Sequence, residues 1–217
     1  MRTGPSATDA NLSFAAHEFV WSSAECTGAQ KYLAPTTIRL LRESGARMVL
    51  DLGCGNGAFT ALLQRSGFEM RGSDISDSGL EVARRQCPDI QFFHHDLAKP
   101  LPDAHVGHYD AVVSIEVVEH LLLPRMLMSN ALSALRPGGL FILSTPFHGY
   151  WKNLVLAALN KFDDHWHPLR DFGHVKFFSK KTLFFLFREY GFHVNEFVRV
   201  GRVPVMACSM IIAASKP

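Results

Sequence analysis

The sequence lacks a strong charge of either sign. Its 217 residues carry 22 Lys and Arg against 20 Asp and Glu, which gives a formal net charge of +2. The basic pairs Arg84-Arg85 and Lys180-Lys181 do not extend into longer runs. Nucleic-acid binding draws most of its affinity from a basic stripe that neutralises phosphates. We therefore expect no nucleic-acid partner.

Cysteines and long apolar runs are also scarce. No two cysteines form a C-x-x-C pair, which favours reduced thiols in the cytoplasm over a disulfide framework. The longest apolar stretch, at 203–214, is too short to span a bilayer, and residues 1–19 lack the apolar core of a secretory signal. We expect a cytoplasmic protein without a transmembrane segment. The cysteines are Cys26, Cys54, Cys87 and Cys208.

One segment leaves membrane contact open. In residues 175–187, VKFFSKKTLFFLF, lysines alternate with phenylalanines and leucines. The favoured interpretation is a core-facing helix with a cationic outer edge. The alternative is a surface that contacts a membrane peripherally.

The remaining pattern predicts one α/β domain over residues 1–217. Apolar, β-compatible segments alternate with segments of helical spacing, which is typical of a doubly wound, mostly parallel sheet with helices on both faces. Two strands close together at the C-terminus predict an antiparallel hairpin. Residues 1–45 are expected to form an arm and a lid helix, and 147–176 an insertion on the substrate side. Strands are expected at 47–52, 68–74, 89–96, 109–116, 140–146, 192–201 and 203–215, and helices at 29–45, 57–67, 76–86, 119–139, 150–162 and 179–191.

A glycine-rich turn follows the first predicted strand. Residues 49–59, VLDLGCGNGAF, place Gly53, Gly55 and Gly57 where the strand meets a helix. Without a Cβ, such a turn lets a nucleotide-like ligand approach the backbone closely. Asp74 ends the second strand. Its separation from the glycine turn along the sequence is about that at which an acidic residue accepts hydrogen bonds from ribose hydroxyls in nucleotide-binding domains. A dinucleotide and a sulfonium nucleoside both fit, while a plain tight turn and a helix-capping role for Asp74 are the structural alternatives.

Three features favour the sulfonium ligand over a dinucleotide. Asp51 lies just before the glycines, where a carboxylate suits a cation better than a pyrophosphate. Asp96 ends the third strand and is placed to accept from an adenine amine. The C-terminal hairpin is not expected in a classical dinucleotide domain. A nicotinamide-dependent reductase is kept as a remote alternative.

Five consecutive segments resemble the class I S-adenosylmethionine-dependent methyltransferases in order and spacing. They are VLDLGCGNG, GSDIS, HHDLAKPL, YDAVVSIEVVEHL and LRPGGLFILSTP, and together they cover about residues 48–146. The resemblance implies a sheet of seven strands in the order 3-2-1-4-5-7-6 and S-adenosylmethionine as cofactor. It also implies the cofactor-binding residues: Asp51 and the three glycines beside the methionine part, Asp74 and Ile75 at the ribose, Asp96 and Leu97 at the adenine, and Ile115 and Glu116 at the end of the fourth strand.

Two further segments are similar to the ubiquinone-pathway O-methyltransferases, which act on polyprenylated phenols. These are SIEVVEHL and GHVKFFSKKTL. Where the family has Gly-Thr-His, this chain has Asp171-Phe172-Gly173-His174, without the Thr, and the family's Arg-x-x-Pro appears as Tyr32-Leu33-Ala34-Pro35. These departures leave the cofactor prediction intact and weaken the one for the substrate.

Histidines are the expected catalytic residues. Removing the proton of a hydroxyl acceptor needs a base that titrates near neutral pH, and His174 and His120 are the candidates. Both also suit a structural, hydrogen-bonded role. If Glu116, Glu119 and His120 shared one helix face, they would also form a divalent-metal site. Metal-independent relatives share the Glu-His pair, so we expect no metal requirement.

The insertion supplies aromatic side chains for an acceptor pocket. Phe147, Tyr150, Trp151 and Trp166 are expected to line it, and a small satellite core is the alternative. The acids and histidines at 163–167 are weak evidence for a second metal site.

The sequence thus predicts methyl transfer to a small molecule, at a hydroxyl of a phenol or quinone precursor. The alternative is a catalytically silent S-adenosylmethionine-binding module that serves a partner protein. The oligomeric state is not predicted.

Overall fold

The fold is taken from a computed structural model that describes residues 28–163, 173–201 and 207–217. Predictions for the N-terminal arm before residue 28, for Trp166 and for 164–167 lie outside these residues. The division of the chain into a lid, a main domain and an insertion stays a prediction. Among the described helices, none is both long and apolar enough to cross a membrane.

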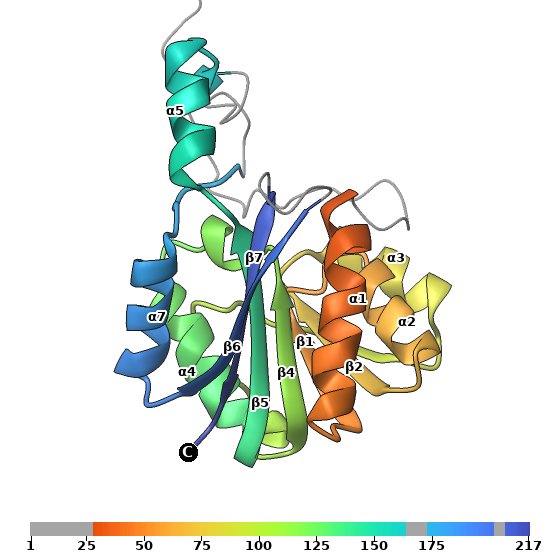
Figure 1. The fold of residues 1–217 in the computed structure, drawn as a ribbon. Helices are drawn as coiled ribbons and strands as arrows, with labels where there is room; N and C mark the ends of the chain where they lie inside the picture. The colour runs from red at the N-terminus through yellow and green to blue at the C-terminus, as the bar shows by residue number, and fades with distance from the viewer. Residues whose placement is uncertain (1–27, 164–172, 202–206) are drawn as a thin grey trace, which may run out of the picture.

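Seven strands form one sheet, and the structure places them as β1 Met48–Leu52, β2 Glu69–Asp74, β3 Gln91–His94, β4 Tyr109–Ile115, β5 Leu135–Pro146, β6 His193–Val200 and β7 Ser209–Ser215. Their order is β3-β2-β1-β4-β5-β7-β6 (Figure 1). The first five strands pair in parallel, whereas β7 pairs antiparallel with both β5 and β6. The predicted α/β class, strand order and terminal hairpin are therefore confirmed.

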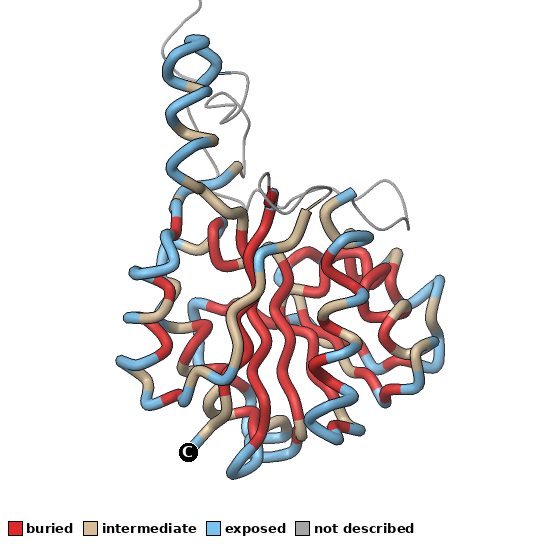
Figure 2. Tube along the Cα trace, viewed as in Figure 1, coloured by how far each residue is buried: buried red, intermediate tan, exposed pale blue. Residues whose placement is uncertain are grey.

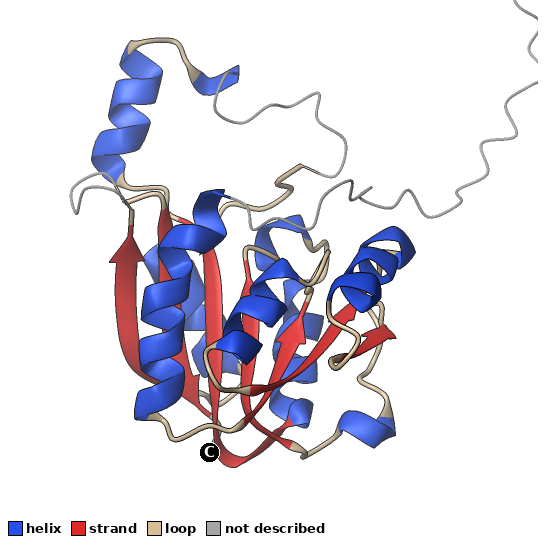
Figure 3. Cartoon of the chain, turned by 90° about the vertical axis from the view of Figure 1, so that its right-hand side faces the viewer, coloured by secondary structure: helices blue, strands red, loops and turns tan. Residues whose placement is uncertain are grey.

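Helices cover both faces of this sheet. One face carries α1 Gly28–Glu43, α2 Ala58–Arg65 and α3 Asp77–Gln86, and the other carries α4 Pro124–Ala134 and α7 Lys180–Glu189. Figures 1 and 3 show the two layers from perpendicular directions. A further helix, α5 Tyr150–Ala158, rises past the end of the sheet, away from both layers.

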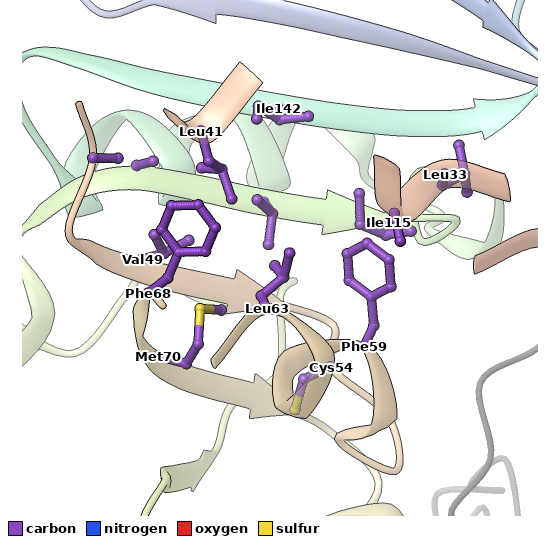
Figure 4. Packing of buried hydrophobic residues seen from close by; sticks show 14 of the residues in the cluster. Leu33, Leu41, Val49, Cys54, Phe59, Leu63, Phe68, Met70, Ile115 and Ile142 are labelled. Atoms are coloured by element: carbon purple, nitrogen blue, oxygen red, sulfur yellow. The ribbon is translucent and has the colours of Figure 1, made fainter. Parts of the chain in front are cut away.

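The core explains why the short apolar segments became strands. Successive side chains of a strand point to opposite faces, so Val113 packs with α1, α2 and α3 while its neighbour Val112 packs with α4 and α7. Figure 4 shows Leu41 and Phe59 of the first layer packed over the sheet. Figure 2 shows that burial is concentrated in the strands and in the helix faces above them. A sheet buried on both sides needs strands that are apolar throughout.

The predicted long helix at 119–139 is wrong at both ends. Glu119 and His120 lie in a short 3-10 turn, η2 Val118–His120, and α4 begins only at Pro124. Proline is favoured at the first helical position because it has no N–H to satisfy. At the other end, Leu135 already belongs to β5, so the Pro-Gly-Gly segment lies within that strand and is not a helix stop.

Candidate active site

Parallel strands bring the predicted cofactor residues to one edge. The carboxyl ends of β1, β2, β3 and β4 meet there, and ligands of doubly wound sheets bind outside this edge. Asp51 pairs with Gly72 of β2 and with Val113 of β4, and Asp74 pairs with His94 of β3. The glycine loop, Asp74, Asp96 and Glu116 therefore extend from neighbouring strand ends.

The glycine loop needs its glycines for their backbone conformation and for space. Gly53, Gly55 and Gly57 have φ of 86°, 55° and 74°, in the left-handed region that side chains disfavour. A Cβ on Gly53 would lie 2.6 Å from a methyl group of Val117, and one on Gly57 would lie 2.7 Å from the Cβ of Ala83. The loop is thus closely packed against Val117, which follows β4, and against Ala83 of α3.

Gly57→Ala tests this packing against a matched control. Gly45 has nearly the same φ, 71°, but nothing within 4 Å of an added Cβ. Both alanine variants should carry the left-handed strain of about 1–2 kcal/mol. Gly57→Ala should lose about 1–3 kcal/mol more, because the new methyl group overpacks Ala83. Urea unfolding of both variants measures the difference, and equal losses would contradict the packing at Gly57.

Asp74 joins the second strand to the glycine loop. One carboxylate oxygen accepts a hydrogen bond from the Gly55 N–H (2.7 Å), and the other accepts one from the Ser76 N–H (2.8 Å). The N-cap of α3 is Ser76, whose hydroxyl accepts from the Gly79 N–H (3.0 Å). Helix capping therefore belongs to Ser76, and the Asp74 carboxylate fixes the loop beside it. Its neighbour Ile75 is exposed at the same strand end.

Asp51 is buried beneath the loop. Its carboxylate accepts a hydrogen bond from the Thr60 hydroxyl at 2.7 Å. Burial raises its pKa to about 7; the Thr60 bond lowers it, and the negative charge of Asp74 adds to the rise. A nearby positive charge would stabilise the ionised form of such a buried carboxyl group.

The Asp51 carboxyl predicts a pH-dependent stability for the ligand-free protein. Because its folded pKa lies above its unfolded value of 3.8, the folded state binds more protons between these values. This contribution to stability is present below about pH 4 and is lost as the pH rises through about 7. We expect Asp51→Asn, which keeps an acceptor for Thr60, to flatten the dependence of Tm on pH between about 5 and 8. An unchanged slope would place the titration elsewhere.

The two residues predicted to lie beside the adenine, Asp96 and Leu97, follow the end of β3. Asp96 is half-buried, and its carboxylate accepts from the Ala98 N–H (2.9 Å) and lies 3.9 Å from the Lys99 ammonium. Leu97 is buried, and its carbonyl accepts from the Asn130 amide (3.2 Å). The turn that carries both residues is therefore held in place before any ligand binds.

Glu116 follows β4 in a strained backbone conformation, with φ of 57°. Its carboxylate accepts hydrogen bonds from the hydroxyls of Ser144 on β5 (2.8 Å) and Ser209 on β7 (3.2 Å). Burial raises the pKa of Glu116 to about 7. Ile115 before it is buried in the core. Left-handed backbone at a residue other than glycine is characteristic of functional sites.

Glu119, three residues further along in the η2 turn, is buried. One of its carboxylate oxygens accepts from the Thr145 hydroxyl at 2.9 Å. The other oxygen, Oε1, is buried with no hydrogen-bond partner among the described residues. Burial and the nearby charge of Glu116 raise the pKa of Glu119.

The structure brings His174 to His120 although the two lie far apart in the sequence. The Val175 and Lys176 N–H groups donate to the Glu119 carbonyl at 2.9 and 3.0 Å. His120 Nδ1 lies 3.1 Å from the Gly173 carbonyl oxygen, and the two imidazole rings contact edge-to-face at 4.9 Å between centroids. Both imidazoles are exposed.

These contacts change the candidate set of metal ligands. Glu116, Glu119 and His120 do not share a helix face, because Glu116 precedes the η2 turn and bonds two serines. Instead, ligand atoms of Glu119, His120 and His174 lie within 4.8 Å of one another. A carboxylate and two imidazoles suit a divalent transition metal. The Glu119 Oε1 atom, which has no hydrogen-bond partner among the described residues, could serve as one of its ligands. The residues therefore fit an ion, although they fit proton transfer equally well.

The predicted acceptor residues are spread out. Phe147 is half-buried, and its N–H donates to the Cys208 carbonyl at 2.8 Å. Tyr150 and Trp151 contact each other edge-to-face on α5, but are 73% and 69% exposed. The described residues thus supply separate aromatic surfaces above the sheet edge rather than a closed pocket, and the acceptor prediction stays a prediction.

Comparison with known proteins gives one family. The sequence family described as "Methyltransferase domain" matches residues 27–196. A probable S-adenosylmethionine-dependent methyltransferase of Mycolicibacterium smegmatis is 33% identical over 146 residues, covering 67% of this chain and 49% of the relative. The chain thus spans about half the length of that relative.

Two further relatives are ubiquinone biosynthesis O-methyltransferases. The one from Hydrogenovibrio crunogenus is 24% identical over 192 residues, covering 86% of this chain and 80% of the relative. The one from Ruegeria pomeroyi is 32% identical over 152 residues, covering 68% of this chain and 60% of the relative.

Solved structures agree at the level of the fold. Magnesium protoporphyrin IX methyltransferase from Synechocystis, with bound S-adenosylhomocysteine, has a TM-score of 0.67 at 20% identity, covering 87% of this chain and 83% of that one. The cyclase SpnF has the same TM-score at 16% identity, covering 94% of this chain and 87% of that one. Because one fold here serves a methyltransferase and a cyclase, these likenesses speak for architecture alone.

Proposed function

Because the chain belongs to the class I S-adenosylmethionine-dependent methyltransferases, we propose that it transfers the methyl group of that cofactor to a hydroxyl oxygen of a small molecule. The observation that carries the proposal is the pair of imidazoles, His120 and His174, held together just beyond the carboxyl end of β4. Such a pair is placed to take the proton that a hydroxyl loses when it is methylated.

The cofactor site is built from the strand-end residues. S-adenosylmethionine supplies an electrophilic methyl group on a sulfonium whose leaving group is already good. The glycine loop gives its methionine part a backbone without side chains, and the buried Asp51 offsets the positive charge. Asp74 turns a fixed carboxylate toward the ribose, and Asp96 and Leu97 flank the adenine.

The remaining catalytic task is alignment and proton removal. Holding the acceptor oxygen in line with the methyl group contributes up to roughly 7–11 kcal/mol in well-aligned cases. A general base adds about 10²–10⁴-fold. His174 is the first candidate for this base, since it lies on the segment whose backbone N–H groups bond to the Glu119 carbonyl of η2. His120 orients it through the contact between their rings.

We place the acceptor among phenols and quinone precursors. Two relatives are named ubiquinone biosynthesis O-methyltransferases, and the exposed aromatic side chains of α5 suit a flat, apolar acceptor. We also assign the enzyme to the cytoplasm, since no disulfide joins its described cysteines, Cys54, Cys87 and Cys208.

Turnover with a panel of acceptors tests the proposal. The purified protein is incubated with labelled S-adenosylmethionine and with catechols, monohydric phenols, sugars and lipid headgroups in parallel. We expect S-adenosylhomocysteine to be released fastest with one of the phenolic acceptors. Tight S-adenosylhomocysteine binding without turnover on any acceptor would contradict the proposal and favour the silent binding module. Turnover on an amine alone would move the reaction from oxygen to nitrogen.

A further inference from the structure

The helix α5 is amphipathic in the reverse of the usual sense. Its apolar side chains Trp151, Leu154 and Val155 share one face by helical spacing, and all three are exposed. Lys152 and Asn153 lie on the opposite face, and both are half-buried. A surface helix ordinarily turns its charged residues to solvent and its apolar residues inward. In α5, which Figures 1 and 2 show extending beyond the sheet, a lysine is instead partly withdrawn from water.

The Lys152 ammonium has no carboxylate partner among the described residues. Partial burial lowers its pKa below the ordinary value of 10.5, while the nearby Cys208 thiol raises it. Residues 147–162 contain no acid. The Oδ1 atom of Asn153 is buried and likewise has no hydrogen-bond partner in the described part of the chain. Since polar groups removed from water are ordinarily paired, this face of α5 is suited to a ligand that supplies an anionic group.

One series of contacts joins Lys152 to the end of β4. Lys152 lies near Cys208, whose carbonyl accepts a hydrogen bond from the Phe147 N–H at 2.8 Å. The next residue, Ser209, donates a hydrogen bond from its hydroxyl to the Glu116 carboxylate at 3.2 Å. Lys152 is thus linked to the strand end at Glu116 through two consecutive residues, Cys208 and Ser209.

A second series of contacts joins the start of α5 to the segment of His174. His148, which lies just before the helix, contacts the Phe177 ring edge-to-face at 5.2 Å between centroids. Phe177 follows His174 by three residues, and the two N–H groups between them donate to the Glu119 carbonyl. The start of α5 is thus connected both to the end of β4 and to the segment that carries the proposed base.

We propose that the acceptor carries a carboxylate and that the Lys152 ammonium binds it, so that the substrate is an aromatic acid with a free hydroxyl group. This proposal rests on the proposed function and names the chemical class of its acceptor. An ammonium offers three donors, and its hydrogen bonds to a carboxylate are strengthened by the opposite charges. One lysine matches the single charge of a carboxylate, whereas a phosphate monoester carries nearly two.

Equilibrium binding tests this proposal without any turnover. The full chain, saturated with S-adenosylhomocysteine, is titrated calorimetrically at pH 7 with the ortho, meta and para isomers of hydroxybenzoate and with the corresponding hydroxybenzamides, which are neutral. We expect one of the acids to bind about 10- to 100-fold more tightly than its amide. Such a preference in a protein that methylates no acceptor would support the carboxylate site while the proposed function fails, so the two results are distinguishable.

Three variants identify the residue. Lys152→Met removes the ammonium and should abolish the preference by weakening binding of the acid alone, with the amide unaffected. Lys152→Arg keeps a cation and should retain most of the preference. The matched control is Lys161→Met, because Lys161 lies beyond the end of α5 and is exposed; it removes the same charge and should leave the preference intact. The Tm of the ligand-free Lys152→Met protein should be unchanged or higher, since no acid among the described residues loses a partner.

Four results would overturn the proposal. The first is equal affinity of the unmodified protein for each acid and its amide, or no binding of any acid. The second is a preference that survives in Lys152→Met or is lost equally in Lys161→Met. The third is tighter binding of hydroxyphenyl phosphate than of every hydroxybenzoate, which would assign the lysine to a phosphate. The fourth is a Tm several degrees lower in Lys152→Met, which would mean that the ammonium has a partner within the chain.

Discussion

His174→Ala should lower turnover by about 10²–10⁴-fold while leaving the affinity for S-adenosylhomocysteine nearly unchanged. The imidazole is exposed and contacts His120, whereas the glycine loop is held by the Asp74 carboxylate. The substitution should therefore remove the proposed base without changing the loop that we propose binds the cofactor. Turnover is measured with saturating acceptor, and cofactor affinity by calorimetry. The matched control is His108→Ala, since His108 is exposed just before β4, at the other end of the sheet.

Two outcomes would contradict this role. Loss of turnover and of cofactor affinity together would mean that the 173–176 segment is structural, because its backbone hydrogen bonds to the Glu119 carbonyl hold it against the η2 turn. Loss of activity on treatment with a chelator, restored by a divalent ion, would reassign Glu119, His120 and His174 as metal ligands. If His174 is a base, the pH profile of turnover should lose its acidic limb in the alanine variant, and chelation should have no effect.

The sheet and the glycine turn between the first strand and the next helix were predictable because their signals are local. A strand buried on both faces needs a continuous apolar run, and β4 supplies one in Ala111, Val112 and Val113, which are all buried. The position of the glycine turn was predictable in a similar way, because a strand, a tight turn and a helix start follow one another directly along the chain. The cofactor role of these glycines and of Asp74 stays a prediction.

The start of α4 was missed although a local signal was present. Pro124 is favoured at a first helical position, and the chain before it is not helical. The predicted helix included Glu119 and His120 and so placed them on one face with Glu116. The left-handed backbone of Glu116 excludes that arrangement. The apolar spacing of 119–139 is helical throughout, and only Pro124 marks the true start of α4.

The meeting of His120 and His174 had no local signal at all. It depends on backbone hydrogen bonds from Val175 and Lys176 to the Glu119 carbonyl, and any residue except proline can donate such a bond. The exposure of α5 to solvent also could not be predicted from the sequence. Its apolar composition predicts a helix, but an apolar helix is usually buried, and its position beyond the sheet edge follows from tertiary structure.

Asp74→Ala should weaken S-adenosylhomocysteine binding by about 1–3 kcal/mol, or about 5- to 150-fold in Kd. The carboxylate accepts from the Gly55 and Ser76 N–H groups, so its removal should loosen the glycine loop. It should also leave the ribose hydroxyls of the cofactor without the acceptor that we propose for them. Asp74→Asn, which keeps one acceptor oxygen, should lose less. Calorimetric titration measures both.

The control for Asp74 separates ligand binding from helix stability. Asp77 lies in the first turn of the neighbouring helix, α3, and is exposed, so Asp77→Ala removes a favourable charge from the helix start without touching the loop. It should cost about 0.3–1 kcal/mol of stability and leave the Kd unchanged. Equal losses of affinity in the two variants would mean that Asp74 acts through α3 alone. A large loss confined to Asp74→Ala would mean that one carboxylate both holds the glycine loop through the Gly55 N–H and accepts hydrogen bonds from the ribose. The conformation of the loop and the binding of the ribose would then depend on the same side chain.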